Sequence, residues 1–129
     1  MTTELTILAL AALLQTVQFC LYSVTAQMQV GSKVAASPRD RAIELTGTAG
    51  RLQRAMNNHF EGLILFTIAV VVVTLGAQSS STTVTCAYIY LAARCLYVPA
   101  YVFGWTPWRS VIWAIGFTAT ITMIVAALL

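Results

Sequence analysis

The stretch Gly62-Leu-Ile-Leu-Phe-Thr-Ile-Ala-Val-Val-Val-Val-Thr74 is almost continuously apolar and carries no charge. A transmembrane β-barrel needs segments of about ten residues in which apolar and polar side chains alternate, so this run favours an α-helix. The whole chain has 129 residues, of which 59% are hydrophobic and 9% charged. These fractions are far from those of a soluble domain, so the sequence predicts an integral membrane protein built of helices.

The uncharged stretches set the number of spans. No charge occurs between Leu5 and Ser32, between Gly62 and Ala93, or between Ser110 and Leu129. Each is long enough to cross a hydrocarbon layer of about 30 Å as a helix. The middle stretch holds two crossings, because the polar segment 78–83 divides it. We therefore expect one all-α domain over residues 1–129, a four-helix transmembrane bundle with spans near 5–30, 54–77, 83–103 and 108–129.

Basic residues predict the orientation of these spans. Five of them lie in or beside the first connection: Lys33, Arg39, Arg41, Arg51 and Arg54. Because Lys and Arg are enriched in cytoplasmic loops, we expect loops 31–53 and 104–109 to be cytoplasmic. Within the first of these, the segment from Ser37 to Glu44 predicts a short capped helix.

Three polar residues at the head of the second span share one helix face. Arg54, Asn58 and Glu61 are spaced by four and three residues. Charged groups at the edge of a bilayer are costly unless they face a protein interior and serve a partner or a polar ligand. This face therefore predicts a site, although the spacing alone also fits a polar network that fixes helix register.

The third span carries a second polar stripe. Tyr90, Arg94, Tyr97 and Tyr101 recur at spacings of four, three and four. Arg94 lies about 14 Å from the helix end near Phe103, which is deep for a cation in a bilayer. We expect it to contact Glu61, the acidic residue at comparable depth. The tyrosines by themselves are more typical of helix packing than of a ligand site.

Together these residues resemble a known family. Arg54, Ala55, Asn58 and Glu61 match an Arg-Ala-x-x-Asn-x-x-Glu signature of the membrane-associated proteins in eicosanoid and glutathione metabolism, the MAPEG family. The third span matches that family's second motif with Arg94, Tyr97 and Tyr101, and Arg109-Ser110 follows in the next loop, as in several prostaglandin E synthase relatives. The resemblance covers nearly the whole chain and favours a bacterial inner membrane over the endoplasmic reticulum, since no retrieval signal ends the chain.

The resemblance implies a homotrimer that holds glutathione as co-substrate between neighbouring subunits. By analogy, Glu61 takes the ammonium group of glutathione, and Arg54 with Asn58 takes carboxylates and amides. The residues implied for binding are Arg54, Asn58, Glu61, Arg94, Tyr97 and Tyr101. Arg109 is implied as the catalytic residue that stabilises the thiolate, with Ser110 donating a hydrogen bond to the same sulfur. The electrophile is then a lipophilic molecule that arrives through the bilayer.

Some positions depart from the family pattern. Relatives often carry arginine near the inner end of the first span, where this chain has Gln27 and Gln29. Gly62 stands where a leukotriene-C synthase has tyrosine, and Met56 replaces a polar residue. The substrate class therefore cannot be transferred from relatives.

The remaining reactive residues have simpler interpretations. His59 is expected to be solvated or lipid-facing, and no metal constellation is visible in the sequence. Cys20, Cys86 and Cys95 show no paired spacing and are expected to be small buried apolar residues. The net charge of +3 suggests contact with anionic membrane lipid, not nucleic acid, because no aromatic-basic motif of a nucleic-acid binder occurs.

Three function classes follow. The first is a glutathione-dependent transferase or peroxidase acting on lipophilic electrophiles, and the second is a non-catalytic relative that binds lipid or a partner. The third is a small four-span multidrug exporter. An exporter of that kind needs a glutamate in the middle of its first span, where this chain has Gln15 and Gln18. The sequence therefore disfavours the third class.

Overall fold

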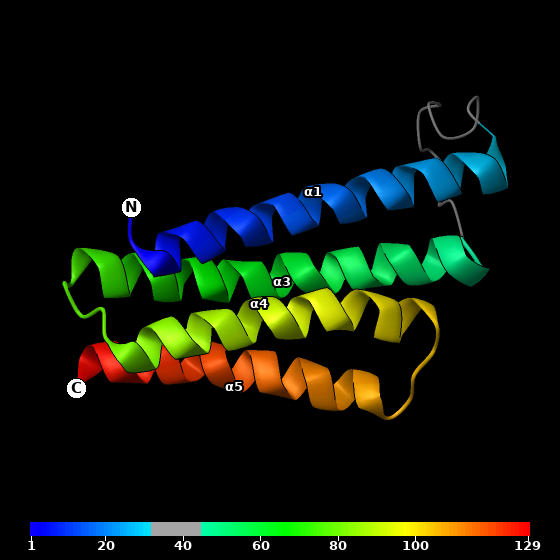
Figure 1. The fold of residues 1–129 in the computed structure, drawn as a ribbon. Helices are drawn as coiled ribbons and strands as arrows, with labels where there is room; N and C mark the ends of the chain where they lie inside the picture. The colour runs from blue at the N-terminus through cyan, green and yellow to red at the C-terminus, as the bar shows by residue number, and fades with distance from the viewer. Residues whose placement is uncertain (32–44) are drawn as a thin grey trace.

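The computed structural model describes residues 1–31 and 45–129, which form four helices. These are α1 (Thr3–Val30), α3 (Gly47–Leu75), α4 (Ser81–Val102) and α5 (Trp108–Leu128). They lie side by side as an up-and-down bundle, with both termini and the α3–α4 turn at one end (Figure 1). The predicted all-α membrane fold is confirmed, and α1, α3 and α5 are each long and apolar enough to cross a membrane.

The sequence predicts that the helix of the second span begins near Gly50 and enters the membrane near Arg54. The helix begins at Gly47, so the basic residues Arg51 and Arg54 lie within it. Gln29 near the end of α1 holds this start in place, because its side chain bonds both backbone groups of Thr46, at 2.8 Å to O and 3.0 Å from N. The short helix expected from Ser37 to Glu44 lies outside the described residues.

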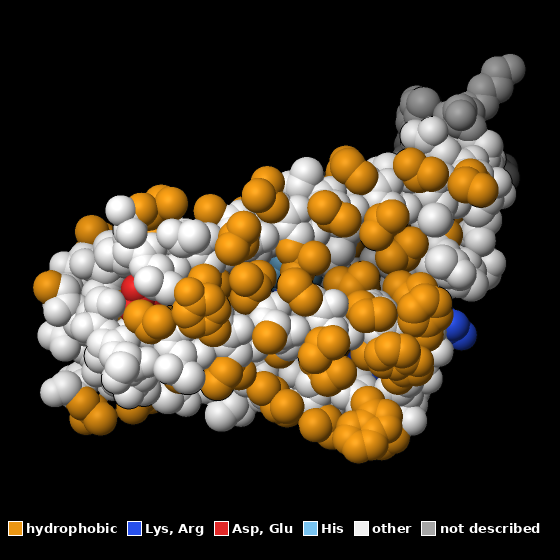
Figure 2. Space-filling model, in the orientation of Figure 1, with side chains coloured by type: hydrophobic (Ala, Val, Ile, Leu, Met, Phe, Trp, Pro, Cys, Tyr) orange, Lys and Arg blue, Asp and Glu red, His pale blue; other side chains and the backbone are white. Residues whose placement is uncertain are grey.

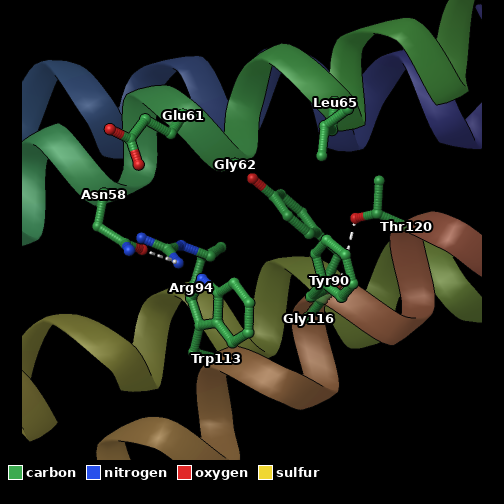
Figure 3. A pocket seen from close by; sticks show the side chains of 10 residues that line it. Asn58, Glu61, Gly62, Leu65, Tyr90, Arg94, Trp113, Gly116 and Thr120 are labelled. Atoms are coloured by element: carbon green, nitrogen blue, oxygen red, sulfur yellow. Dashed lines mark hydrogen bonds between the residues drawn. The ribbon is translucent and has the colours of Figure 1, made fainter.

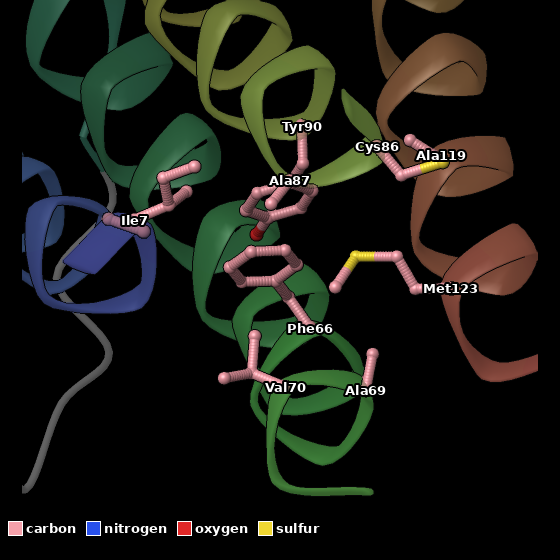
Figure 4. Packing of buried hydrophobic residues seen from close by; sticks show 10 residues of the cluster. Ile7, Phe66, Ala69, Val70, Cys86, Ala87, Tyr90, Ala119 and Met123 are labelled. Atoms are coloured by element: carbon pink, nitrogen blue, oxygen red, sulfur yellow. The ribbon is translucent and has the colours of Figure 1, made fainter. Parts of the chain in front are cut away.

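The core is formed by apolar side chains from all four helices. The Phe66 ring on α3 stacks on the Tyr90 ring of α4, with centroids 3.9 Å apart and planes 5° from parallel. Alanines on neighbouring helices surround the pair and let the backbones approach closely (Figure 4). The stack lies about one helical turn from Glu61 on α3 and from Arg94 on α4. It fixes the register between these two helices.

Large apolar side chains also cover the outside of the bundle (Figure 2). A soluble protein rarely exposes so much apolar surface, whereas a bilayer favours it. Cys20 and Cys95 lie on this outer surface and only Cys86 is buried, so the expectation of three buried cysteines was wrong for two of them. In a membrane helix, apolar character does not distinguish the inner face from the lipid-facing one.

The end of the bundle that holds both termini is fixed by Glu4. Its carboxylate, in a side chain only 1% exposed, accepts hydrogen bonds from Ser79 Oγ and Thr83 Oγ1, each at 2.7 Å. Ser80 and Thr83 form a capping box at the start of α4. A negative charge beside a helix N-terminus is favourable, so Glu4 ties α1 to the α3–α4 turn and to α4.

Candidate functional site

The site lies where α3 and α4 run antiparallel. Arg54 Nε donates to the Tyr101 hydroxyl at 3.1 Å, and one turn further along α3, Asn58 Oδ1 accepts from Arg94 Nη1 at 2.9 Å. One more turn along, Gly62 faces the hydroxyl of Tyr90. Because residues four apart share a helix face, Arg54, Asn58 and Gly62 form one edge of the site.

Arg94 is the most deeply buried cation of the site. Its side chain is 3% exposed, and its guanidinium carbon lies 4.3 Å from the centroid of the Tyr97 ring. Within the described part of the chain, its Nε and Nη2 atoms have no hydrogen-bond partner. The expected contact with Glu61 was wrong: the two side chains line one cavity but form no ion pair within 4.0 Å. The guanidinium extends toward Tyr97 and Asn58, whereas Glu61 lies almost one turn deeper along α3.

A tyrosine lies between two arginines at the head of the site. Tyr101 accepts the Arg54 hydrogen bond through its hydroxyl, and the Arg109 guanidinium carbon lies 4.7 Å from the centroid of its ring. Arg51 is close by and donates to the backbone oxygen of Val102 at 2.9 Å, at the end of α4. We call this region the arginine end of the bundle, defined by Arg54, Arg94 and Arg109, with Arg51 beside it and bonded to the end of α4.

Of the carboxylates in the described residues, Glu61 is the one nearest to these cations. It is exposed on α3, beside the cavity that Asn58 and Arg94 also line, and it has no hydrogen bond or ion pair to any other described residue (Figure 3). A carboxylate in the middle of a membrane-crossing helix is costly against lipid. A cation from outside the described residues would stabilise this carboxylate.

Two adjoining cavities are lined by most of the predicted site residues. The outer cavity, about 320 Å³, is lined by Asn58, Tyr97, Tyr101, Arg109, Ser110 and Trp113. The inner cavity, about 220 Å³, lies deeper between α3, α4 and α5 and includes Asn58, Glu61, Arg94 and Trp113 in its lining. Asn58 and Trp113 line both, so the two cavities adjoin at these side chains. Arg54 lines neither cavity but is held at their edge by Tyr101.

The sequence analysis misplaced His59. This residue is fully buried between α1 and α3, with its Nδ1 atom 2.8 Å from Gln18 Nε2 and 2.7 Å from Gln15 Oε1. The expectation of a solvated or lipid-facing histidine was therefore wrong. The two glutamines in the middle of the first span were the available signal, because polar side chains there need a partner on a neighbouring helix.

Comparison with known proteins identifies the family of this chain. The family model described as the MAPEG family matches residues 7–129. The chain belongs to the MAPEG family. No curated protein and no solved structure gives a significant match to it. MAPEG membership supports a membrane function in glutathione-related or eicosanoid metabolism in general, and the residues at the arginine end carry the argument for a particular reaction.

Proposed function

We propose that this MAPEG protein is a membrane-bound glutathione-dependent transferase or peroxidase that acts on lipophilic electrophiles. One observation carries the proposal: in the described chain, the arginine end holds three guanidinium groups without an acidic partner, next to one carboxylate that is also unpaired. Glutathione has two carboxylates, one ammonium group and one thiol. Its charges complement this set, because guanidinium groups bind carboxylates through paired hydrogen bonds.

The geometry suggests how glutathione would lie. Glu61 would bind the ammonium group, since it is the unpaired carboxylate of the site, and Arg54 and Arg94 would bind the carboxylates. The unpartnered Nε and Nη2 atoms of Arg94 are donors available for that purpose. Tyr97 and Tyr101 line the outer cavity and would donate hydroxyl hydrogen bonds or lie along the tripeptide backbone.

The thiol would lie beside Arg109 and Ser110 in the outer cavity. A free thiol has a pKa near 8.5, so only a few per cent is ionised at neutral pH, and lowering that pKa by ~2 units is worth about 2.7 kcal/mol. The Arg109 guanidinium would supply this through its charge, and the Ser110 hydroxyl through a hydrogen bond. In the transferase reaction the sulfur attacks carbon, a carbon–sulfur bond forms, and the electron pair of the broken bond leaves on the displaced group or epoxide oxygen. In the peroxidase reaction the sulfur attacks a hydroperoxide oxygen, the O–O bond breaks and its electron pair leaves on the alkoxide, and a second glutathione thiol converts the sulfenic acid to the disulfide and water.

A second copy of the chain would complete the site. Glu61 is exposed on the outer face of α3, where lipid is an unfavourable neighbour for a charge. We propose a homotrimer in which the neighbouring subunit covers this face and encloses glutathione. This arrangement would also shield the polar edge formed by Arg54, Asn58 and Glu61 from the hydrocarbon.

Calorimetric titration of the purified protein with glutathione tests the proposal. We expect saturable binding that is weakened by Glu61→Gln and largely kept by Arg51→Ala, a matched control at an arginine bonded to the end of α4. S-methylglutathione, which cannot form a thiolate, should bind more weakly than glutathione to the parent. Intact trimer that does not bind glutathione at millimolar concentration would rule the proposal out and leave a non-catalytic relative that binds lipid or a partner.

A further inference from the structure

The inner cavity extends beyond the residues that a tripeptide would need. Below Asn58 and Glu61 its walls are apolar or small, and they come from α3, α4 and α5: Gly62, Leu65, Tyr90, Gly116, Phe117 and Thr120. Two glycines create part of this space. A Cβ atom at Gly62 would lie 3.6 Å from the Tyr90 hydroxyl, and one at Gly116 would lie 3.4 Å from Ala93 Cβ.

Tyr90 places a single polar atom in this apolar region. Its side chain is 2% exposed and its ring is held by the stack on Phe66, so the hydroxyl cannot turn toward water. The hydroxyl is directed toward Gly62 (Figure 3) and has no hydrogen-bond partner among the residues that the structure describes. A buried hydroxyl without a partner costs stability, which a bound acceptor atom would recover.

Other polar groups near Tyr90 do not satisfy its hydroxyl. The Thr120 hydroxyl donates to the backbone oxygen of Gly116 at 3.0 Å and forms no bond with the Tyr90 hydroxyl. Arg94, one turn along α4, has unpartnered donors of its own, its Nε and Nη2 atoms. Tyr90 and Arg94 thus present unpartnered donors to one cavity, and no acceptor of the described chain bonds the Tyr90 hydroxyl.

The depth of Tyr90 indicates which molecule brings that acceptor. Tyr90 lies seven residues before Tyr97 on α4, which is about 10 Å further along the helix and away from the arginine end. Glutathione is polar along its whole length and suits the outer cavity together with the polar mouth of the inner one, at Asn58, Glu61 and Arg94. Leu65, Trp113 and Phe117 are exposed at the rim of the inner cavity, so an apolar molecule can enter from the bilayer between α3 and α5.

We infer that the inner cavity binds a lipophilic molecule that carries a neutral hydrogen-bond-accepting oxygen, such as a carbonyl, epoxide or hydroperoxide oxygen, and that the Tyr90 hydroxyl donates to it. Tyr90 is then a positioning and specificity residue, and Gly62 and Gly116 provide room for the apolar body. That this molecule is the electrophilic substrate rests on the proposed function. That it binds in the inner cavity does not depend on the proposed function.

A matched pair of probes tests the inference: para-bromophenyl heptyl ketone and para-bromo-octylbenzene. They share a carbon skeleton and differ by the carbonyl oxygen, and their bromine quenches a tryptophan that it contacts. Quenching of Trp113 in the intact protein reports binding, and Trp113→Phe identifies which part of the signal arises there. One hydrogen bond predicts that the parent binds the ketone about fivefold more tightly than the hydrocarbon.

Tyr90→Phe should abolish this preference while leaving the affinity for the hydrocarbon unchanged. Tyr88→Phe is the matched control, because Tyr88 is exposed on the same helix, and the preference should survive there. Gly62→Ala adds a methyl group at ordinary contact distance and should weaken binding of both probes. Equal affinities in the parent, or a ketone preference that persists in Tyr90→Phe, would overturn the inference.

The measurement is made without glutathione, so it separates two failures. A ketone preference that depends on Tyr90, in protein that does not bind glutathione, supports the cavity and contradicts the proposed function. Glutathione binding without quenching of Trp113 by either probe supports the function and contradicts the inference. An unfolded Tyr90→Phe variant is recognised by its elution in gel filtration, and Gly62→Ala then decides: unchanged binding of both probes contradicts the inference.

Discussion

Glu4 and Glu61 both carry carboxylates in membrane-crossing helices, but the two side chains differ in burial and in hydrogen bonding. Glu4 is buried, accepts two hydroxyl hydrogen bonds and lies at the N-terminus of α4. Glu61 is exposed, lines a cavity and has no partner in the described chain. A charge whose hydrogen bonds are satisfied inside the chain stabilises the fold, whereas one without a partner is available for a ligand or another subunit. Under the proposed function, this difference separates a structural end of the bundle, at Glu4, from the functional end, at Glu61.

The largest expected effect is on turnover, at the functional end. Arg109→Ala should reduce the rate of glutathione conjugation at pH 7 by about 30-fold, because the thiolate fraction falls from most of the bound thiol to a few per cent. The activity of the parent should rise with pH around an inflection near ~6.5, and that of the variant around one near ~8.5. Steady-state rates between these pH values check it, and an unshifted inflection would contradict the assignment of Arg109.

The second largest effect concerns Glu61. Glu61→Gln should weaken glutathione binding by roughly tenfold or more, the value of a lost charge-assisted hydrogen bond, with no decrease in the midpoint of thermal unfolding. Calorimetry and thermal melts of the same sample give both quantities. A lower midpoint with unchanged affinity would make Glu61 a structural residue like Glu4 and remove the contrast.

Glu4→Gln should show the reverse pattern. It replaces a charged acceptor of two hydroxyl hydrogen bonds by a neutral amide, so the free energy of unfolding should fall by about 1–3 kcal/mol. Glutathione affinity should stay within the error of the measurement, since Glu4 lies at the opposite end of the bundle (Figure 1). A change in affinity comparable to that of Glu61→Gln would show that the two ends are coupled.

A smaller change, in the free energy of unfolding, is expected when the buried contact between α1 and α3 is removed. His59→Ala removes the partner that Gln15 and Gln18 share, and it should lower the free energy of unfolding by about 1–2 kcal/mol. Asn57→Ala, at an exposed neighbour, is the control and should change stability little. Glutathione binding should be unaffected in both variants, and a loss of binding in His59→Ala would extend the site to α1.

The helices were predictable because the apolar runs that favour them are continuous in the sequence. Continuous apolar runs such as 62–74 demand backbone hydrogen bonds within the segment, whatever the rest of the chain does. The start of α3 at Gly47 lies close to the start near Gly50 that the glycines predict. The two hydrogen bonds that join Gln29 to Thr46 there link residues 17 positions apart, and periodicity does not predict them.

The site was predictable to the extent that it follows helix periodicity. Spacings of three and four placed Arg54, Asn58 and Glu61 on one edge, and the structure brings Asn58 and Arg94 together across two helices. Periodicity does not determine which of two adjacent turns a long side chain reaches, so the partner of Arg94 was misassigned to Glu61. The unpartnered hydroxyl of Tyr90 depends on side-chain packing and could only be found in the structure.

The most direct test of the central claim is the ultraviolet difference absorbance of bound glutathione near the thiolate band, measured at pH 7 for the parent, Arg109→Ala and Arg51→Ala. We expect saturable binding with a thiolate signal in the parent and in Arg51→Ala, and binding without that signal in Arg109→Ala. Bound glutathione that remains a thiol in the parent, or a thiolate signal that persists in Arg109→Ala, would contradict the account.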